Sequence, residues 1–182
     1  MDPFSLLGLP RRPLVSEEEV GTAYRSLAGK LHPDQSGGDA SSFRELGEAA
    51  AILRDPSRRL RNLIDDSSLG LLPTRAADLF PQIALILQRS EDLLHKHSST
   101  SHALGKALLA QPLKEAASDL STILATVRDW RKSLNRELQE LDHGWPEHQV
   151  SQVLLLANSF AYAGRWETEL SERELALTAI LP

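Results

Sequence analysis

The tripeptide His32-Pro33-Asp34 is the part of this 182-residue sequence whose residue types best suit a chemical role. Proline fixes its own φ angle, lacks an N–H donor, and pushes the residue before it out of the α region. Asp34 should therefore project from a rigid corner as a carboxylate acceptor, a group suited to a bidentate arginine on another protein. The alternative is a structural role, in which Asp34 only caps a loop and His32 is a surface turn residue. The flanking sequence favours the first interpretation.

Other reactive residue types do not form a recognisable site. His95, His97 and His102 are close in sequence. Two histidines two positions apart on a helix point about 200° apart, however, and no carboxylate completes a metal site. The Ser36-Gly37-Gly38 run lacks the strand, lysine and hydroxyl residue of a phosphate-binding loop. The sequence therefore predicts no catalytic residue, no metal and no cofactor, and a binding protein rather than an enzyme.

Composition and charge narrow the possible partners and the compartment. Twenty Lys and Arg against 25 Asp and Glu give a net charge of −5, so the chain has no general attraction for nucleic acid or anionic lipid. The absence of cysteine excludes disulfides, thiol catalysis and cysteine-ligated clusters in this chain. No uncharged apolar run reaches the about 20 residues of a membrane span. These features predict a cytoplasmic protein of the bacterial cytosol, or of an organellar matrix if the chain is a processed form.

The tripeptide lies between two predicted amphipathic helices. Ser16 and Glu19 form a capping box that starts the first, which ends at His32-Pro33. Its apolar residues recur with helical spacing: Val20, Ala23, Tyr24, Leu27 and Leu31. The second helix carries Phe43, Leu46, Ala50 and Leu53 and ends at Asp55-Pro56, and a third, short helix runs from Ser57 to about Ile64. The spacing predicts an antiparallel helical hairpin with the tripeptide in its loop.

The second half of the chain is also predicted to be helical. One helix should start near 78–81 and run to about Lys96, and a short apolar piece, 103–109, should precede Pro112. A long helix then has leucine or valine at every seventh position, at Leu113, Leu120, Val127, Leu134 and Leu141. The chain turns at 143–146, and a last helix follows from Val150 to about Leu170. Short loops between long helices predict an antiparallel bundle of about three helices.

In this setting the N-terminal part resembles the J-domain of the DnaJ co-chaperone family. The resemblance covers residues 2 to about 64. It rests on four segments that follow one another along the chain in the order expected for the family. They are Asp2-Pro3-Phe4-Ser5-Leu6-Leu7-Gly8-Leu9, Ala23-Tyr24-Arg25-Ser26-Leu27-Ala28, His32-Pro33-Asp34, and Phe43-Arg44-Glu45-Leu46-Gly47-Glu48-Ala49 leading to Leu53-Arg54-Asp55-Pro56-Ser57-Arg58-Arg59.

The resemblance implies that the loop and the helix before it dock on a 70-kDa heat-shock chaperone and stimulate its ATPase. The chaperone-binding residues that it implies are His32, Pro33 and Asp34, with Arg25 and Lys30 adding positive charge to the docking face. The ATP and its chemistry would belong to the partner. The alternative for the two cations is that they are merely solvated.

The layout of the whole chain is similar to that of the HscB iron–sulfur cluster assembly co-chaperone family. It implies a J-domain over 2–66, a linker over 67–77 and a C-terminal helical bundle over 78–182. Such a bundle would bind an iron–sulfur scaffold protein. Alternatively, it serves another client or oligomerisation through the heptad positions. No client-binding residues carry over, because the family's motif is replaced by 83–89; an apolar strip over Ile83 to Leu94 is either a client surface or plain bundle core.

Overall fold

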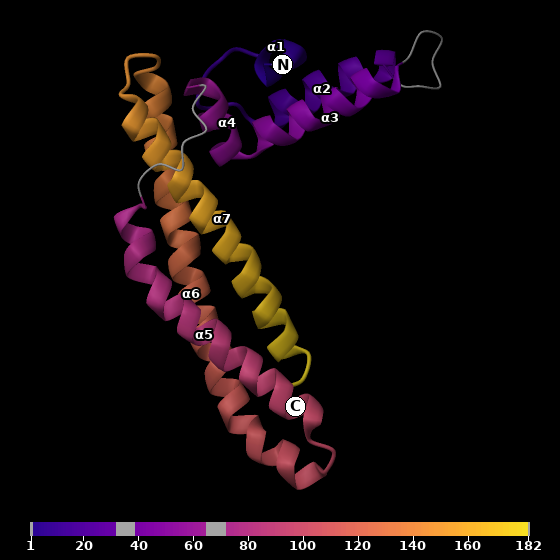
Figure 1. The fold of residues 1–182 in the computed structure, drawn as a ribbon, viewed down its shortest axis with the longest axis vertical. Helices are drawn as coiled ribbons and strands as arrows, with labels where there is room; N and C mark the ends of the chain where they lie inside the picture. Colours follow the sequence, from indigo (N-terminus) through magenta and orange to yellow (C-terminus); the bar gives the residue numbers. More distant parts are fainter. Residues whose placement is uncertain (1, 32–38, 65–71, 182) are drawn as a thin grey trace. The chain divides into compact units, whose positions relative to one another are not determined.

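The computed structural model describes residues 2–31, 39–64 and 72–181, and every regular element within them is an α-helix (Figure 1). The expected all-α class is confirmed. In chain order the helices are α1 (Pro3–Leu7), α2 (Glu17–Leu31), α3 (Ala40–Arg54), α4 (Pro56–Ile64), α5 (Thr74–Ser99), α6 (Ala103–His143) and α7 (Val150–Thr178).

Contacts divide the chain into two compact units. Unit 1 contains Met1–Leu71 together with Leu134–Phe160, and unit 2 contains Leu72–Ser133 together with Ala161–Pro182. The first unit thus includes the end of α6 and the start of α7 as well as α1–α4. The expected division into 2–66, 67–77 and 78–182 is a different one, and it stays a prediction.

The hairpin of α2 and α3 forms as the apolar spacing predicts. The capping box is present: the Glu19 amide donates to Ser16 Oγ at 3.1 Å, and the Ser16 amide donates to Glu19 Oε2 at 2.7 Å. Burial is uneven along the predicted stripes, since Val20, Leu46 and Leu53 are fully buried whereas Ala23, Tyr24, Leu27 and Leu31 are half-buried. The two helices therefore pack most tightly at the end away from the loop.

Helix α1 covers that end of the hairpin. Phe4 is fully buried and Leu7 nearly so. Asp2 caps the helix by accepting from the Ser5 amide at 2.9 Å, and Gly8 ends it at φ 65°, a left-handed conformation that favours glycine. The family-like opening of the sequence is therefore a short capped helix that completes the core of α2 and α3.

The connector, residues 8–16 between α1 and α2, is fixed by the buried side chain of Arg59 on α4. Arg59 Nε donates to the Pro13 carbonyl at 2.7 Å, and Nη1 donates to the Leu53 carbonyl at 2.5 Å. The amide of Leu14 donates to Asp142 Oδ1 at 2.9 Å, 128 positions away in sequence. One cation and one carboxylate thus satisfy backbone groups of the connector that would otherwise have no partner.

A second arginine on the connector joins the ends of α1 and α4. Arg11 pairs with Asp2 at 3.1 Å, and its Nη2 donates to the carbonyls of Asn62 and Leu63, both at 3.0 Å. These two carbonyls lie in the last turn of α4, where no intrahelical donor remains. Trp145 Nε1 in turn donates to the Arg11 carbonyl at 3.0 Å. The connector therefore contacts both α4 and the turn between α6 and α7.

The charge on Arg59 persists at neutral pH despite its burial. Burial lowers the pKa of Arg59 to about 10, against the favourable charges of Asp55 and Asp142. Another α4 residue, Arg61, donates to Asn158 Oδ1 on α7. Polar contacts from α4 thus reach the connector, α3 and α7 within unit 1.

In unit 2, α5 and the adjoining parts of α6 and α7 run side by side, with α6 antiparallel to both (Figure 1). Exposed ion pairs connect each pair of helices. Arg89 on α5 pairs with Asp119 on α6 at 2.8 Å, Arg131 on α6 with Glu167 on α7 at 2.5 Å, and Arg173 on α7 with Glu91 on α5 at 3.4 Å. These three helices form the predicted bundle.

The heptad positions of α6 are occupied by contacts within the chain. Leu113, Leu120, Val127, Leu134 and Leu141 are all buried. Trp130, expected in the core, is 9% exposed and lies 6.1 Å from the Trp166 ring, which in turn lies 5.4 Å from the Tyr162 ring. Because the seam is already buried, it offers no free face for the oligomerisation considered above.

Two prolines do not delimit helices as expected. Helix α5 begins at Thr74, so Pro81 lies inside it, and α6 continues through Pro112 and absorbs the apolar piece 103–109. Ala76 and Leu79 extend the buried stripe of α5 to the N-terminal side of Pro81. No residue of α6 before Leu113 is buried, so the carbonyl that loses its donor at Pro112 lies in a solvated turn. Helix α7 also runs past Leu170, to Thr178.

Removing the buried guanidinium should destabilise the chain. We expect Arg59→Ala to lower the free energy of unfolding by about 3 kcal/mol, because it leaves two buried carbonyls without donors and a cavity at α4. Arg58→Ala, which alters the neighbouring exposed arginine, should change it by less than about 0.5 kcal/mol. Urea denaturation of the full chain measures both values. Equal, small effects of the two substitutions would show that the connector does not depend on Arg59.

Candidate functional site

The tripeptide His32-Pro33-Asp34 lies outside the described residues, and the structure fixes the two ends between which it falls. Helix α2 ends at Leu31, and α3 begins at Ala40 with Asp39 as its N-cap. The antiparallel course of α2 and α3 brings these two ends to the same side of the hairpin (Figure 1). The segment that carries the tripeptide therefore starts and finishes on neighbouring helices.

Asp39 anchors the start of α3 with four hydrogen bonds. Its carboxylate accepts from the amides of Ser41 and Ser42 at 3.4 and 2.8 Å, and from their hydroxyls at 2.9 and 2.7 Å. These bonds, that from the Ser42 hydroxyl foremost, hold the pKa of Asp39 well below its usual range. The cap was not predicted, although an aspartate two residues before a serine pair is a recognisable N-terminal signal.

The two predicted cationic residues of the docking face, Arg25 and Lys30, are both exposed on α2. Arg25 Nη2 donates to Thr22 Oγ1 at 3.2 Å, and the guanidinium lies back along the helix over Gly21, where an added Cβ would come within 3.2 Å of Nη1. The two residues are five positions apart, about 140° around the helix, so they point to well-separated sides of it. The structure thus places them on the solvent side of α2 and does not bring them together.

A third cation near this face was not predicted from the sequence. The guanidinium of Arg54, the last residue of α3, lies 5.8 Å from the centre of the Tyr24 ring on α2. This contact joins the two helices of the hairpin beside Arg25. No periodic signal identifies such a pair, because it depends on the register between the helices.

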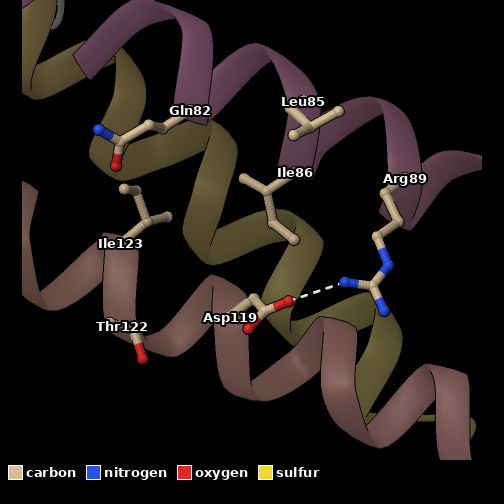
Figure 2. Close-up of a pocket in the computed structure, with 7 residues that line it drawn as sticks. All are labelled: Gln82, Leu85, Ile86, Arg89, Asp119, Thr122 and Ile123. Atoms are coloured by element: carbon tan, nitrogen blue, oxygen red, sulfur yellow. Dashed lines mark hydrogen bonds and ion pairs between the residues drawn. The ribbon is translucent and has the colours of Figure 1, made fainter. Parts of the chain in front are cut away.

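A shallow groove of about 320 Å³ lies between α5 and α6 in unit 2 (Figure 2). Leu85 and Ile86 form its apolar wall, and Arg89 closes one end by pairing with Asp119. Leu85 is 71% exposed.

The apolar strip expected over Ile83 to Leu94 can now be compared with the burial of its residues. Ile83, Ile86 and Leu93 are buried, as the core interpretation requires, whereas Leu85 faces solvent. The strip is therefore bundle core for most of its length and has one strongly exposed leucine beside the groove.

The histidines and acidic residues of the described part of the chain do not gather. No group of three or more His, Cys, Asp or Glu residues is placed there to hold a metal ion. Among the same residues, no helix is both long and apolar enough to cross a lipid bilayer.

Comparison with known proteins identifies a domain in the N-terminal part of the chain. Residues 2–61 match the family model of the DnaJ domain, which confirms the resemblance drawn from the sequence. The chaperone protein DnaJ of Hyphomonas neptunium is 48% identical over 61 residues, which are 32% of this chain and 15% of that protein. Protein SIS1 of Saccharomyces cerevisiae is 43% identical over 56 residues, 31% of this chain and 15% of that protein. The chain thus spans about 15% of the length of these relatives.

One similarity extends beyond the DnaJ domain. The co-chaperone protein HscB homolog of Bordetella avium is 26% identical over 139 residues, which cover 72% of this chain and 82% of that protein. No solved structure matches this chain. The distant homology to HscB over most of the chain agrees with the expected layout.

The Asp39 cap gives a test of how the tripeptide segment is anchored. We expect Asp39→Ala to speed amide hydrogen exchange at Ser41 and Ser42, whereas Asp39→Asn, which keeps an acceptor, should largely preserve protection. Because the folded pKa of Asp39 is depressed, its stabilisation is complete above the usual value of 3.8 and is lost as the pH falls toward the folded value. Exchange of the two amides should therefore accelerate, relative to the Asn variant, below about pH 3.8. Equal acid sensitivity in both variants would contradict this assignment.

Proposed function

Because residues 2–61 are a DnaJ domain, we propose that this protein is a co-chaperone that stimulates the ATPase of a 70-kDa heat-shock chaperone. The observation that carries the proposal is this domain match, together with the His32-Pro33-Asp34 tripeptide in the segment between α2 and α3. On this proposal, ATP binding and hydrolysis take place in the partner. The chain described here contributes a docking surface and no catalytic residue.

The docking surface consists of the tripeptide segment and the solvent side of α2. Asp34 supplies a carboxylate for a partner arginine, and Pro33 restricts the backbone on both of its sides, so little conformational entropy is lost on binding. Arg25 and Lys30 add positive charge on α2. The three acidic residues of α2 lie in its first turn, whereas these two cations lie in its later turns, which are therefore locally positive. A complementary partner surface would therefore be acidic and carry an arginine.

A chaperone ATPase assay tests the docking surface. We expect Asp34→Asn to raise the concentration of co-chaperone needed for half-maximal stimulation by about tenfold or more, because it removes one charge-assisted hydrogen bond worth about 1.5–3 kcal/mol. His32→Gln should also lose most of the stimulation. The measurement is single-turnover ATP hydrolysis by a 70-kDa chaperone of the same organism, with the full chain as activator.

Arg25→Ala and Lys114→Ala form the matched control in this assay. Each removes one exposed cation, but only Arg25 lies on the proposed surface. Arg25→Ala should weaken stimulation and Lys114→Ala should not. If Asp34→Asn and His32→Gln stimulate as well as the unaltered chain, the proposed docking mode is wrong.

The finer proposal is that the helical bundle presents an iron–sulfur cluster scaffold protein to the chaperone. It is supported by the homology to the HscB homolog, which covers 82% of that protein and, at 139 residues, extends beyond the DnaJ domain match. The exposed side chain of Leu85, which lines the groove between α5 and α6, is the most suitable contact point on α5 (Figure 2). Use of the bundle for another client remains the alternative. The bacterial cytosol remains the expected compartment.

Titration of a scaffold protein into the full chain separates these alternatives. We expect Leu85→Asp to weaken binding by about tenfold or more, because burying a leucine at an interface contributes about 1.5–3 kcal/mol. Leu104→Asp is the control, since Leu104 on α6 is 73% exposed, close to the 71% of Leu85, and lies outside the groove. Isothermal titration calorimetry gives both dissociation constants. No binding by the unaltered chain at high micromolar concentration would remove the scaffold proposal and leave the ATPase proposal intact.

A further inference from the structure

A second groove lies in unit 1, between the last turns of α6 and the first turns of α7. It has a volume of about 370 Å³. Glu137, Glu140 and Leu141 line it from α6, Leu155 and Leu156 line it from α7, and His148 lines it from the turn between the helices. None of these residues belongs to the DnaJ domain or to the groove between α5 and α6. A carboxylate edge thus borders an apolar floor.

The two carboxylates of this groove are exposed and lie one helical turn apart. Within the described part of the chain, neither Glu137 nor Glu140 makes a side-chain hydrogen bond or an ion pair. Desolvation by burial raises the pKa of Glu137, and the like charge of Glu140 one turn away raises it further, against the smaller effect of Arg136. A cation from outside would reduce the repulsion between the two carboxylates.

Some carboxylates elsewhere on the bundle helices are paired. Glu167 on α7 is bound by both Arg128 and Arg131, and Asp119 on α6 is bound by Arg89. Glu169 is bound by Arg165 one turn earlier on α7.

The floor of the groove is apolar and held in place. Leu155 is 43% exposed, whereas Leu141 and Leu156 beside it are each 7% exposed. A half-exposed leucine between two buried ones offers a contact for one aliphatic side chain of a partner.

The imidazole of His148 closes one end of the groove in a fixed position. Its ring stacks on Trp145, with centroids 6.4 Å apart, and lies so close to Gly144 that an added Cβ would be 2.6 Å from His148 Cε1. His148 Nδ1 is buried and makes no hydrogen bond within the described residues.

We propose that this groove binds a basic amphipathic segment of a partner protein, with lysine or arginine at Glu137 and Glu140 and an aliphatic side chain on Leu155. The negative charge of the groove favours a positively charged partner. The exposed leucine favours a segment with an apolar face over a free cation. A metal ion does not fit, since no three ligand residues gather there. The site is separate from the chaperone-docking surface, so it goes beyond the proposed function.

A labelled peptide provides a direct probe. The probe is a synthetic 14-residue amphipathic helix with leucines on one face and lysines on its edge, and the measurement is fluorescence anisotropy with the full chain. We expect micromolar binding that weakens by about tenfold or more in the double variant Glu137→Gln/Glu140→Gln, which removes two charge-assisted contacts. Leu155→Ser should also weaken it. The same peptide with glutamate in place of lysine should not bind.

The double variant Glu17→Gln/Glu18→Gln is the matched control. It removes the same two charges from exposed positions on α2 that are remote in sequence from the groove, and it should leave binding unchanged. On addition of the lysine peptide, the pKa of Glu137, followed by NMR of its side-chain carboxyl, should fall. His32→Gln should bind the peptide normally, so failure of the chaperone proposal and failure of this one are distinguishable.

Three results would overturn the proposal. They are absence of binding to the unaltered chain, an equal loss in the groove variant and the α2 variant, and binding that leaves the pKa of Glu137 unchanged. Self-association of the chain that competes with the peptide and requires Glu137 and Glu140 would also overturn it, because a second copy would then be the occupant.

Discussion

The arrangement of unit 1 depends on one buried cation. Arg59 on α4 places hydrogen-bond donors on the carbonyls of Pro13 and Leu53, so the connector, α3 and α4 share a single guanidinium. The charge is costly to bury, as the lowered pKa shows, and Asp55 and Asp142 offset part of that cost. Apolar packing alone would not fix the position of the connector relative to α3, because hydrophobic contacts have no direction. The two hydrogen bonds from Arg59 fix that position.

This constraint matters for the proposed chaperone contact because the position of the tripeptide depends on the positions of the two helices that flank it. Packing of α1 and Arg59 fixes the hairpin at the end away from the tripeptide, where Val20, Leu46 and Leu53 are fully buried. At the other end Asp39 caps the start of α3 near solvent. The hairpin is therefore strongest where it meets the rest of unit 1 and depends on polar contacts where it would meet a partner.

Periodicity and capping signals predicted the helices, and long-range polar contacts were not predictable. The capping box at Ser16 and Glu19 and the seam from Leu113 to Leu141 follow from local spacing, and both are present. Pro81 and Pro112 misled the prediction of helix ends, because buried positions on both sides of Pro81, and a solvated turn before Pro112, allow each helix to continue. The bond from Leu14 to Asp142 spans 128 positions and leaves no pattern in the sequence.

The distribution of charge pairs also argues for selection on binding as well as on stability. Two exposed arginines bind Glu167, although such surface pairs contribute little to folding. Yet at Glu137 and Glu140 a repulsive pair beside an apolar floor has been left without a cation. Exchanging either glutamate for glutamine would relieve the repulsion without disturbing a hydrogen bond within the described residues. A partner that supplies lysine or arginine would reduce this repulsion, and this charge complementarity is the basis of the binding proposed for the groove.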